Sequence, residues 1–387
     1  MAPPPPPTAV GALHSAPPSP PSAAASAVPK PMRPAAAAAE EEKAGHATPR
    51  PPPTGEAAGD AGAVASLLAG LRSAPPAIKT VPCSFLYDGP GSRLYDAITD
   101  LAAYYPYRAE ADLLAAHGGA IGAALPADAV LVELGCGSAT KTGALVAAAA
   151  AARPGGAAAT AYVGIDCSAD FLANARANVA AAVPGLPAGN VETVCALYLD
   201  GARAVRGMHP TSTLAFLWLG SSIGNLAPDA AAAFVTELFA IGGGPGRCCL
   251  LLCTDLWKEA GRLRAAYDDD EGVTAAFIRN GLSHALACLP GGLEAAAAAG
   301  ARPDAWQYEV LINEGATQVE MRLACPAPAG IAAGAIAPGV GFAPGEQVLM
   351  EVSRKFTPAA VDALAAAAGV GVVARWASED YGIQLLA

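Results

Sequence analysis

The sequence predicts an α/β fold with a parallel sheet, because apolar segments of strand length alternate with helical segments from Ala111 onward. A strand predicted over 130–134 is followed by Gly135-Cys136-Gly137 and then by a helix over 141–152. Glycines after a strand let the backbone approach a ligand closely, at the carboxyl edge where open α/β sheets bind ligands. The arrangement predicts a nucleotide pocket.

The next strand, over 161–165, indicates which nucleotide. It ends at Asp166, a carboxylate placed to accept hydrogen bonds from two ribose hydroxyls. The full G-x-G-x-x-G of dinucleotide sites is missing, because Ala139 and Thr140 occupy the places where a third glycine would let a pyrophosphate pass. We therefore expect S-adenosylmethionine (SAM) as cofactor, with NAD as the weaker alternative. The structural alternatives are that the glycines only form a turn and that Asp166 only caps a helix.

The remaining elements follow the same alternation and then depart from it. They are a helix over 61–73, a helix over 169–182, strands over 191–197, 214–219 and 248–252, helices over 259–267 and 273–289, a hairpin of 306–312 and 318–323, a helix over 358–367, and strands over 370–375 and 381–386. Polar groups at 220–225 and 254–255 follow two of the strands and reach the same sheet edge. Between Trp257 and Phe356 the alternation breaks down, which predicts an inserted lid or substrate layer.

Composition excludes several kinds of partner. A net charge of −11 without any cluster of Lys and Arg argues against nucleic acid. No segment approaches the roughly eighteen apolar residues of a membrane span. The nine cysteines follow neither a disulfide framework nor a zinc spacing, which favours a reducing compartment, and the five histidines are scattered, so we expect no metal. A cytoplasmic monomer is the expectation.

Residues 1–60 are predicted to be a disordered tail of Pro, Ala and Ser, because burial of so little apolar surface cannot offset the entropy of ordering it. An organelle transit peptide is the alternative, although the many prolines and few arginines suit one poorly. The expected domains after the tail are 61–109 as the N-terminal part of a substrate domain, 110–256 as the core, 257–356 as the inserted part of the substrate domain, and 357–387 as the completion of the core sheet.

Short strings spread from Pro82 to the C-terminus carry a more specific signal. They are LYDGPGS (86–92), YYPYR (104–108), VELGCG (132–137), LGSSIGN (219–225), AYDD (266–269), GVTAAF (272–277) and EVSRKF (351–356). In this order they resemble the histidine-specific Nα-methyltransferases of ergothioneine biosynthesis. Several lie in the predicted substrate layer, so the resemblance is to this family rather than to the fold alone.

The resemblance implies a Rossmann-like SAM-dependent methyltransferase core with an additional α+β substrate-binding domain. The residues it places around the cofactor are Tyr87, Gly135, Gly137, Lys141, Asp166 and Tyr198. The sequence names no general base; from the chemistry alone we expect the amine to release its protons to water past Tyr87, which makes Tyr87 the catalytic candidate. The residues that the resemblance places around L-histidine are Tyr104, Asn225 and Tyr267 at the carboxylate and amine, Gly220 and Thr274 along the wall, Glu351 and Ser353 at the imidazole, and Met321 and Phe277 as apolar neighbours. One departure is Ala196-Leu197-Tyr198, where bacterial members have Gly-Asp-Phe, so the adenine amine loses a carboxylate partner.

The residues themselves are consistent with this chemistry. Methyl transfer requires an unprotonated amine aligned with the methyl group and shielded from water, and no nucleophilic side chain. Glu351 and Ser353, two apart on a short strand, face the same side and suit two ring nitrogens. The expected reaction is threefold Nα-methylation of L-histidine to the trimethylated betaine, hercynine.

Several alternatives stay open at the level of sequence. A tryptophan derivative could be the substrate, although Glu351 and Met321 count against the apolar pocket that it would need. A noncatalytic SAM-binding regulator would keep the same pocket. Residue by residue, Tyr104 could be a packed aromatic, Lys141 a surface lysine, and Met321 and Phe277 ordinary core.

Overall fold

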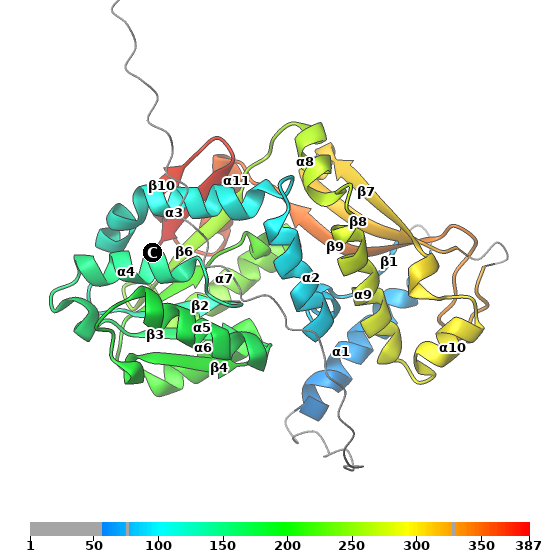
Figure 1. The fold of residues 1–387 in the computed structure, drawn as a ribbon, viewed down its shortest axis with the longest axis horizontal. Helices are drawn as coiled ribbons and strands as arrows, with labels where there is room; N and C mark the ends of the chain where they lie inside the picture. The colour runs from blue at the N-terminus through cyan, green and yellow to red at the C-terminus, as the bar shows by residue number, and fades with distance from the viewer. Residues whose placement is uncertain (1–55, 75–76, 327–329) are drawn as a thin grey trace, which may run out of the picture. The chain divides into compact units, whose positions relative to one another are not determined.

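The computed structural model describes residues 56–74, 77–326 and 330–387, so most of the predicted tail lies outside the described residues. Seven strands form one sheet in the order β10-β11-β6-β5-β2-β3-β4 (Figure 1). Their bounds are β2 Val130–Leu134, β3 Tyr162–Asp166, β4 Val191–Cys195, β5 Leu214–Trp218, β6 Cys248–Asp255, β10 Val372–Ala377 and β11 Tyr381–Leu386. Strands β2 to β6 run parallel, as predicted, whereas β11 is antiparallel to both β6 and β10.

Helices cover both faces of this sheet, because successive strand residues point to opposite sides. Leu131 of β2 packs in one apolar cluster with α3 (Tyr105–Ala124), α4 (Thr142–Ala152) and α5 (Ala169–Ala182). Its neighbours Val130 and Val132 pack in another. That second cluster contains α6 (Tyr198–Met208), α7 (Pro228–Gly242) and α11 (Pro358–Ala367). Within the described ranges, none of the helices has the length and apolar character that crossing a membrane requires.

A smaller sheet of order β1-β9-β8-β7 forms the second layer (Figure 1). Its strands are β1 Lys79–Thr80, β7 Gln307–Asn313, β8 Gln318–Ala324 and β9 Gln347–Arg354. The predicted hairpin is therefore confirmed as β7 and β8, joined through a short 3-10 turn. Around the sheet lie α1 Glu56–Leu71, α2 Gly89–Asp100, α8 Ala260–Tyr267, α9 Val273–Ala287 and α10 Gly292–Ala298.

One apolar core joins the N-terminal segment to the late insertion. It contains Leu67 of α1, Ile98 of α2, Ile278 of α9, and Val319 of β8. The helix predicted over 61–73 exists but begins at Glu56, so the last five residues of the predicted tail belong to α1. Segments far apart in the sequence thus build one layer beside the larger sheet, and a role of this layer at the substrate stays a prediction.

The two sheets meet where β6 and β9 end. The backbone N–H of Phe356 donates to the carbonyl of Asp255 at 2.8 Å, and the N–H of Trp257 donates to the carbonyl of Phe356 at 3.0 Å. The carboxyl end of β6 is therefore fixed beside the last residues of β9. This junction sets the place of the site described below.

A glycine in α3 shows how closely the helices pack on the larger sheet. A Cβ at Gly122 would lie 2.8 Å from the carbonyl oxygen of Ala148 in α4, whereas a Cβ at Gly119 would have no atom within 4 Å. We expect Gly122→Ala to lower the free energy of unfolding by about 1–3 kcal/mol, because one helix must move. Gly119→Ala is the matched control and should raise stability by up to about 1 kcal/mol. Equal melting temperatures for the two variants would contradict the close packing of α3 on α4.

Candidate active site

The turn after β2 leaves its backbone open to a ligand. Gly135 and Gly137 have φ of +70° and +50°, in the left-handed region that favours glycine. A Cβ at Gly135 would come within 2.7 Å of the Tyr198 hydroxyl, so a side chain has no room there. No atom lies within 4 Å of a Cβ at Gly137. The predicted glycine turn therefore packs against Tyr198 at one glycine and faces open space at the other.

Asp166 ties the ends of β2 and β3 together. Its Oδ2 accepts a hydrogen bond from the Gly137 N–H and its Oδ1 accepts one from the Ser168 N–H, both at 2.9 Å. Each oxygen keeps a further lone pair with which to accept a ribose hydroxyl. Helix α5 is capped by Ser168, whose Oγ accepts from the Phe171 N–H, so Asp166 is not the cap of that helix.

Glu133, the acidic residue of the glycine motif, serves the fold. Its carboxylate is buried and accepts hydrogen bonds from the Thr142 hydroxyl at 2.7 Å and the Tyr162 hydroxyl at 2.6 Å. Burial raises the pKa of Glu133 to about 7, although both hydrogen bonds act in the opposite direction. These bonds hold the start of α4 against β2 and β3, and so keep the shape of the glycine turn.

Lys141 is paired with the protein rather than exposed. Its ammonium forms an ion pair with the fully buried Glu110 and lies 4.4 Å from the centre of the Tyr107 ring. Glu110 also accepts from the Gly220 N–H at 2.6 Å and from the Tyr381 hydroxyl at 3.0 Å. Burial opposes the charge of Lys141, but the Glu110 carboxylate outweighs it and raises the lysine's pKa. The interpretation of Lys141 as a surface lysine is therefore wrong, and its predicted role at the cofactor stays a prediction.

A pocket lies at the junction of the two sheets. Its lining consists of Tyr87, Tyr95, Tyr104, Pro106, Gly220, Ser221, Ser222, Asn225, Asp255, Tyr267, Glu351 and Ser353, and it has a volume of about 50 Å³. Six of the residues predicted to hold the substrate are among them. The aromatic segment before α3, the loop after β5 and strand β9 thus come together, as the resemblance implied.

Glu351 is one of two carboxylates that line this pocket, and the other, Asp255, is paired with Lys258 and Lys355. The Oε1 of Glu351 accepts from the Tyr87 hydroxyl at 3.3 Å and from the Asn225 side-chain amide at 3.0 Å. Burial raises the pKa of Glu351 to about 7, while the two hydrogen bonds and the nearby Lys355 favour the charged form. Glu351 therefore faces the pocket with partners from two other segments of the chain.

The other end of the pocket carries hydroxyl groups. The Tyr267 hydroxyl lies 3.0 Å from the Ser353 Oγ, and the Tyr267 ring packs edge-on against Tyr104 at 5.8 Å between ring centres. Ser221 adopts φ of +58°, and its Oγ accepts from the Asp255 N–H at 2.9 Å. The pocket therefore has an acidic end at Glu351 and a hydroxyl end at Ser353.

Three predicted substrate residues lie outside the lining. Phe277 packs edge-on against Tyr87 at 5.5 Å, and Met321 is buried opposite Glu351 in the β8–β9 ladder. Thr274, also buried, donates its backbone N–H to Asp269. Phe277 and Met321 thus occupy core positions, as the alternative interpretation had it. Direct contact of Phe277, Met321 or Thr274 with a substrate stays a prediction.

Some lining residues had no predicted role at the substrate. These are Tyr95, Pro106, Ser221, Ser222 and Asp255. For Asp255 and the two serines a signal existed, since each follows a predicted strand at the ligand edge. For Tyr95 the signal was its place in an aromatic segment, and for Pro106 its place in a string shared with the family.

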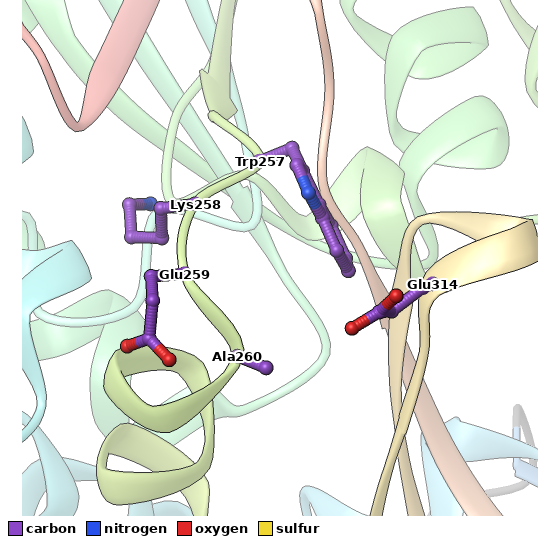
Figure 2. Close-up of a pocket in the computed structure, with 5 residues that line it drawn as sticks. All are labelled: Trp257, Lys258, Glu259, Ala260 and Glu314. Carbon is purple, nitrogen blue, oxygen red and sulfur yellow. The ribbon is translucent and has the colours of Figure 1, made fainter.

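A second hollow, of about 700 Å³, lies at the start of α8 (Figure 2). It is lined by Trp257, Lys258, Glu259, Ala260 and Glu314. Lys258 donates to Asp255 at 2.6 Å and to the Tyr105 hydroxyl at 2.8 Å, and Glu259 caps α8. Because Lys258 and Glu259 already have partners in the protein, and none of the five lining residues is a predicted site residue, the pocket at Glu351 is the better candidate for the chemistry.

The parallel sheet, the open glycine turn and the carboxylate after the next strand define a SAM-dependent methyltransferase. A family model described as histidine-specific methyltransferase, SAM-dependent, matches residues 63–387, and the chain belongs to this family. Its residues fit the cofactor, because Gly137 faces open space and Asp166 has acceptor capacity to spare.

Relatives agree with this assignment. The chain is 37% identical to the histidine N-alpha-methyltransferase of Mycobacterium tuberculosis, over 86% of this chain and 97% of that protein. It is 36% identical to the protein of the same name from Mycolicibacterium smegmatis, over 82% and 92% of the two chains. The ergothioneine biosynthesis protein 1 of Neurospora crassa is 29% identical over 54% of this chain and 23% of its own length.

The role of Asp166 can be tested by binding. We expect Asp166→Ala to weaken the affinity for S-adenosylhomocysteine by about 1.5–3 kcal/mol, the scale of hydrogen bonds to a charged group. Isothermal titration calorimetry on the folded variant measures this. Ser168→Ala, which removes the cap of α5 but keeps the carboxylate, is the control and should bind within about twofold of the wild type. Unchanged affinity in Asp166→Ala would remove this residue from the cofactor site.

Proposed function

We propose that this protein transfers methyl groups from SAM to the α-amino nitrogen of L-histidine, three times in succession, and so forms hercynine for ergothioneine biosynthesis. The observation that carries the proposal is the pocket with Glu351 at one end and Ser353 at the other, built at the ligand edge of a SAM-dependent methyltransferase sheet. The names of the mycobacterial relatives support the same substrate. Cytoplasmic location and a monomeric state stay predictions.

The cofactor supplies an electrophilic methyl group next to the sheet edge. Asp166 accepts the ribose hydroxyls in this proposal, and the open backbone at Gly137 lets the rest of the molecule approach, next to Gly135. Tyr87, Lys141 and Tyr198 complete the surroundings. The protein's task is then to bring one nitrogen into line and to keep water away from it.

A volume of about 50 Å³ is far below the roughly 300 Å³ or more of ordinary small-molecule sites, so some side chains of the lining must shift when the substrate enters. Glu351 then accepts a hydrogen bond from one imidazole nitrogen, and Ser353 forms a hydrogen bond with the other. Asn225 and Tyr104 hold the carboxylate and the amine, and the Tyr267 hydroxyl lies beside Ser353, 3.0 Å from its Oγ.

The amine must lose a proton before each transfer. Burial, reinforced by the nearby Glu351 carboxylate, raises the pKa of Tyr87 well above its usual value, so its phenol stays neutral. A neutral hydroxyl both donates and accepts, which suits Tyr87 to pass a proton along hydrogen bonds rather than to hold it as a base. We therefore assign Tyr87 to the path by which the proton leaves.

The substrate assignment is tested by incubating the purified protein with SAM and the twenty common amino acids. Mass spectrometry should find up to three added methyl groups on histidine and none on the others. Methylation of a different amino acid would overturn the substrate. Binding of SAM without transfer to any of them would favour a noncatalytic regulator.

A substitution of Glu351 tests the substrate assignment most directly. We expect Glu351→Ala to raise the KM for histidine at least about tenfold, on the order of 1.4 kcal/mol, because a buried ring nitrogen loses its acceptor. The affinity for S-adenosylhomocysteine should change little and serves as the control for folding. If steady-state kinetics of the variant match those of the wild type, the imidazole is recognised elsewhere.

Because the pKa of Glu351 is raised, the affinity for histidine should depend on pH. In the ligand-free protein the charged form dominates above about pH 7 and is lost below it, because the folded-state pKa of this group lies above the usual 4.5. Histidine affinity should therefore fall between about pH 8 and pH 6. In Glu351→Gln the affinity should fall with pH only as far as the titration of the histidine imidazole itself requires. Identical pH profiles of wild type and variant would contradict the assignment.

A further inference from the structure

Lys355 is a buried cation directly beside the pocket. The residue directly follows strand β9, and its side chain has no solvent exposure. The ammonium donates to three groups, the Asp255 carboxylate at 2.7 Å, the Tyr267 hydroxyl at 2.7 Å and the Ser353 hydroxyl at 2.8 Å. An ammonium has three N–H donors and no acceptor, so every one of its hydrogen bonds is directed into this cluster.

These contacts determine how the two hydroxyls can point. Both hydroxyl oxygens accept a hydrogen bond from Lys355, so neither can direct its own proton at the lysine. The same two oxygens are 3.0 Å apart, which lets one hydroxyl donate to the other. Two hydroxyls carry two protons, and one is used between them. One O–H is left, and it is free to point into the pocket.

We infer that Lys355 is a positioning residue, which holds the Tyr267 and Ser353 hydroxyls so that this end of the pocket presents an O–H donor and selects a hydrogen-bond acceptor on the substrate. The inference rests on the proposed function, in which that acceptor is the unprotonated ring nitrogen of histidine. Glu351 at the other end accepts from the ring N–H. Together the two ends of the pocket are complementary to a neutral imidazole, which carries one hydrogen-bond donor and one acceptor.

The charge of Lys355 is held in place by its surroundings. Asp255 provides the opposite charge, and the ammonium also lies 4.5 Å from the centre of the Tyr267 ring. Although burial opposes the charged form, the Asp255 carboxylate outweighs it and raises the pKa of Lys355. The lysine therefore stays a donor throughout the working pH range.

The chain provides a matched control. Lys258 pairs with the same Asp255 carboxylate but lines the other hollow and donates to Tyr105 instead of the pocket hydroxyls. Replacing either lysine by Met removes one cation from Asp255. Only Lys355→Met also releases Tyr267 and Ser353.

The test compares two ligands in protein saturated with S-adenosylhomocysteine. One is histidine, and the other is β-(2-thienyl)alanine, whose five-membered ring has no nitrogen. We expect wild-type protein to prefer histidine, and Lys355→Met to reduce that preference at least about tenfold, the scale of a hydrogen bond to a charged or well-oriented partner. In Lys258→Met the preference should stay within about threefold of the wild type.

A merely structural lysine would weaken both ligands equally, so an unchanged preference in folded Lys355→Met overturns the inference, as does an equal loss in Lys258→Met. If Lys355→Met does not fold, Lys355→Gln replaces it. Its amide still donates to Asp255, while its carbonyl can accept from a hydroxyl and turn that proton away from the pocket. The same loss of preference is expected. Wild-type protein that neither binds nor methylates histidine would instead refute the proposed function, whatever the lysine variants do.

Discussion

The buried carboxylate of Asp255 is the constraint on which the site depends. It lies at the end of β6 with 1% exposure, between the ammonium groups of Lys258 and Lys355, and accepts from the Tyr105 hydroxyl with both oxygens, at 3.0 and 2.8 Å. A buried charge without partners would cost several kcal/mol. Folding must therefore bring the start of α3, the end of β6 and the end of β9 to one point, and this places β9 of the smaller sheet against the larger one.

A second buried carboxylate, Glu110, organises the neighbouring part of the same edge. It joins Lys141 before α4, the Gly220 N–H after β5 and the Tyr381 hydroxyl of β11. Glu110 and Asp255 thus orient loops that follow different strands. The pocket lies beside these fixed groups, and Gly220 and Asp255 belong to its lining. The ion pairs of Glu110 and Asp255 therefore fix the backbone around the pocket, and the hydroxyl and amide groups that face a ligand are held in place by it.

Sequence reasoning succeeded where the local pattern is strong. The strands of the larger sheet and the β7–β8 hairpin agree with their predicted ranges to within a few residues, because continuous apolar runs bounded by turn residues have few alternatives. Helices α2, α3, α6, α7 and α10 were not predicted. Gly118, Gly119 and Gly122 in α3 lower its intrinsic helix propensity, and its stability comes from packing on α4, which no local window of sequence contains.

The sequence by itself determined the class of fold, the cofactor and the family, because the glycine turn, Asp166 and the shared strings are local features with a local physical meaning. It also placed Glu351 and Ser353 on one side of a strand by simple alternation. Only the tertiary structure decided that Lys141 pairs with Glu110, that Lys355 holds Tyr267 and Ser353, and that Phe277 packs behind Tyr87. The sequence separations of these contacts range from two residues to nearly two hundred, and the side chain that each group meets depends on how helices, strands and loops pack together, which a pattern along the chain does not specify.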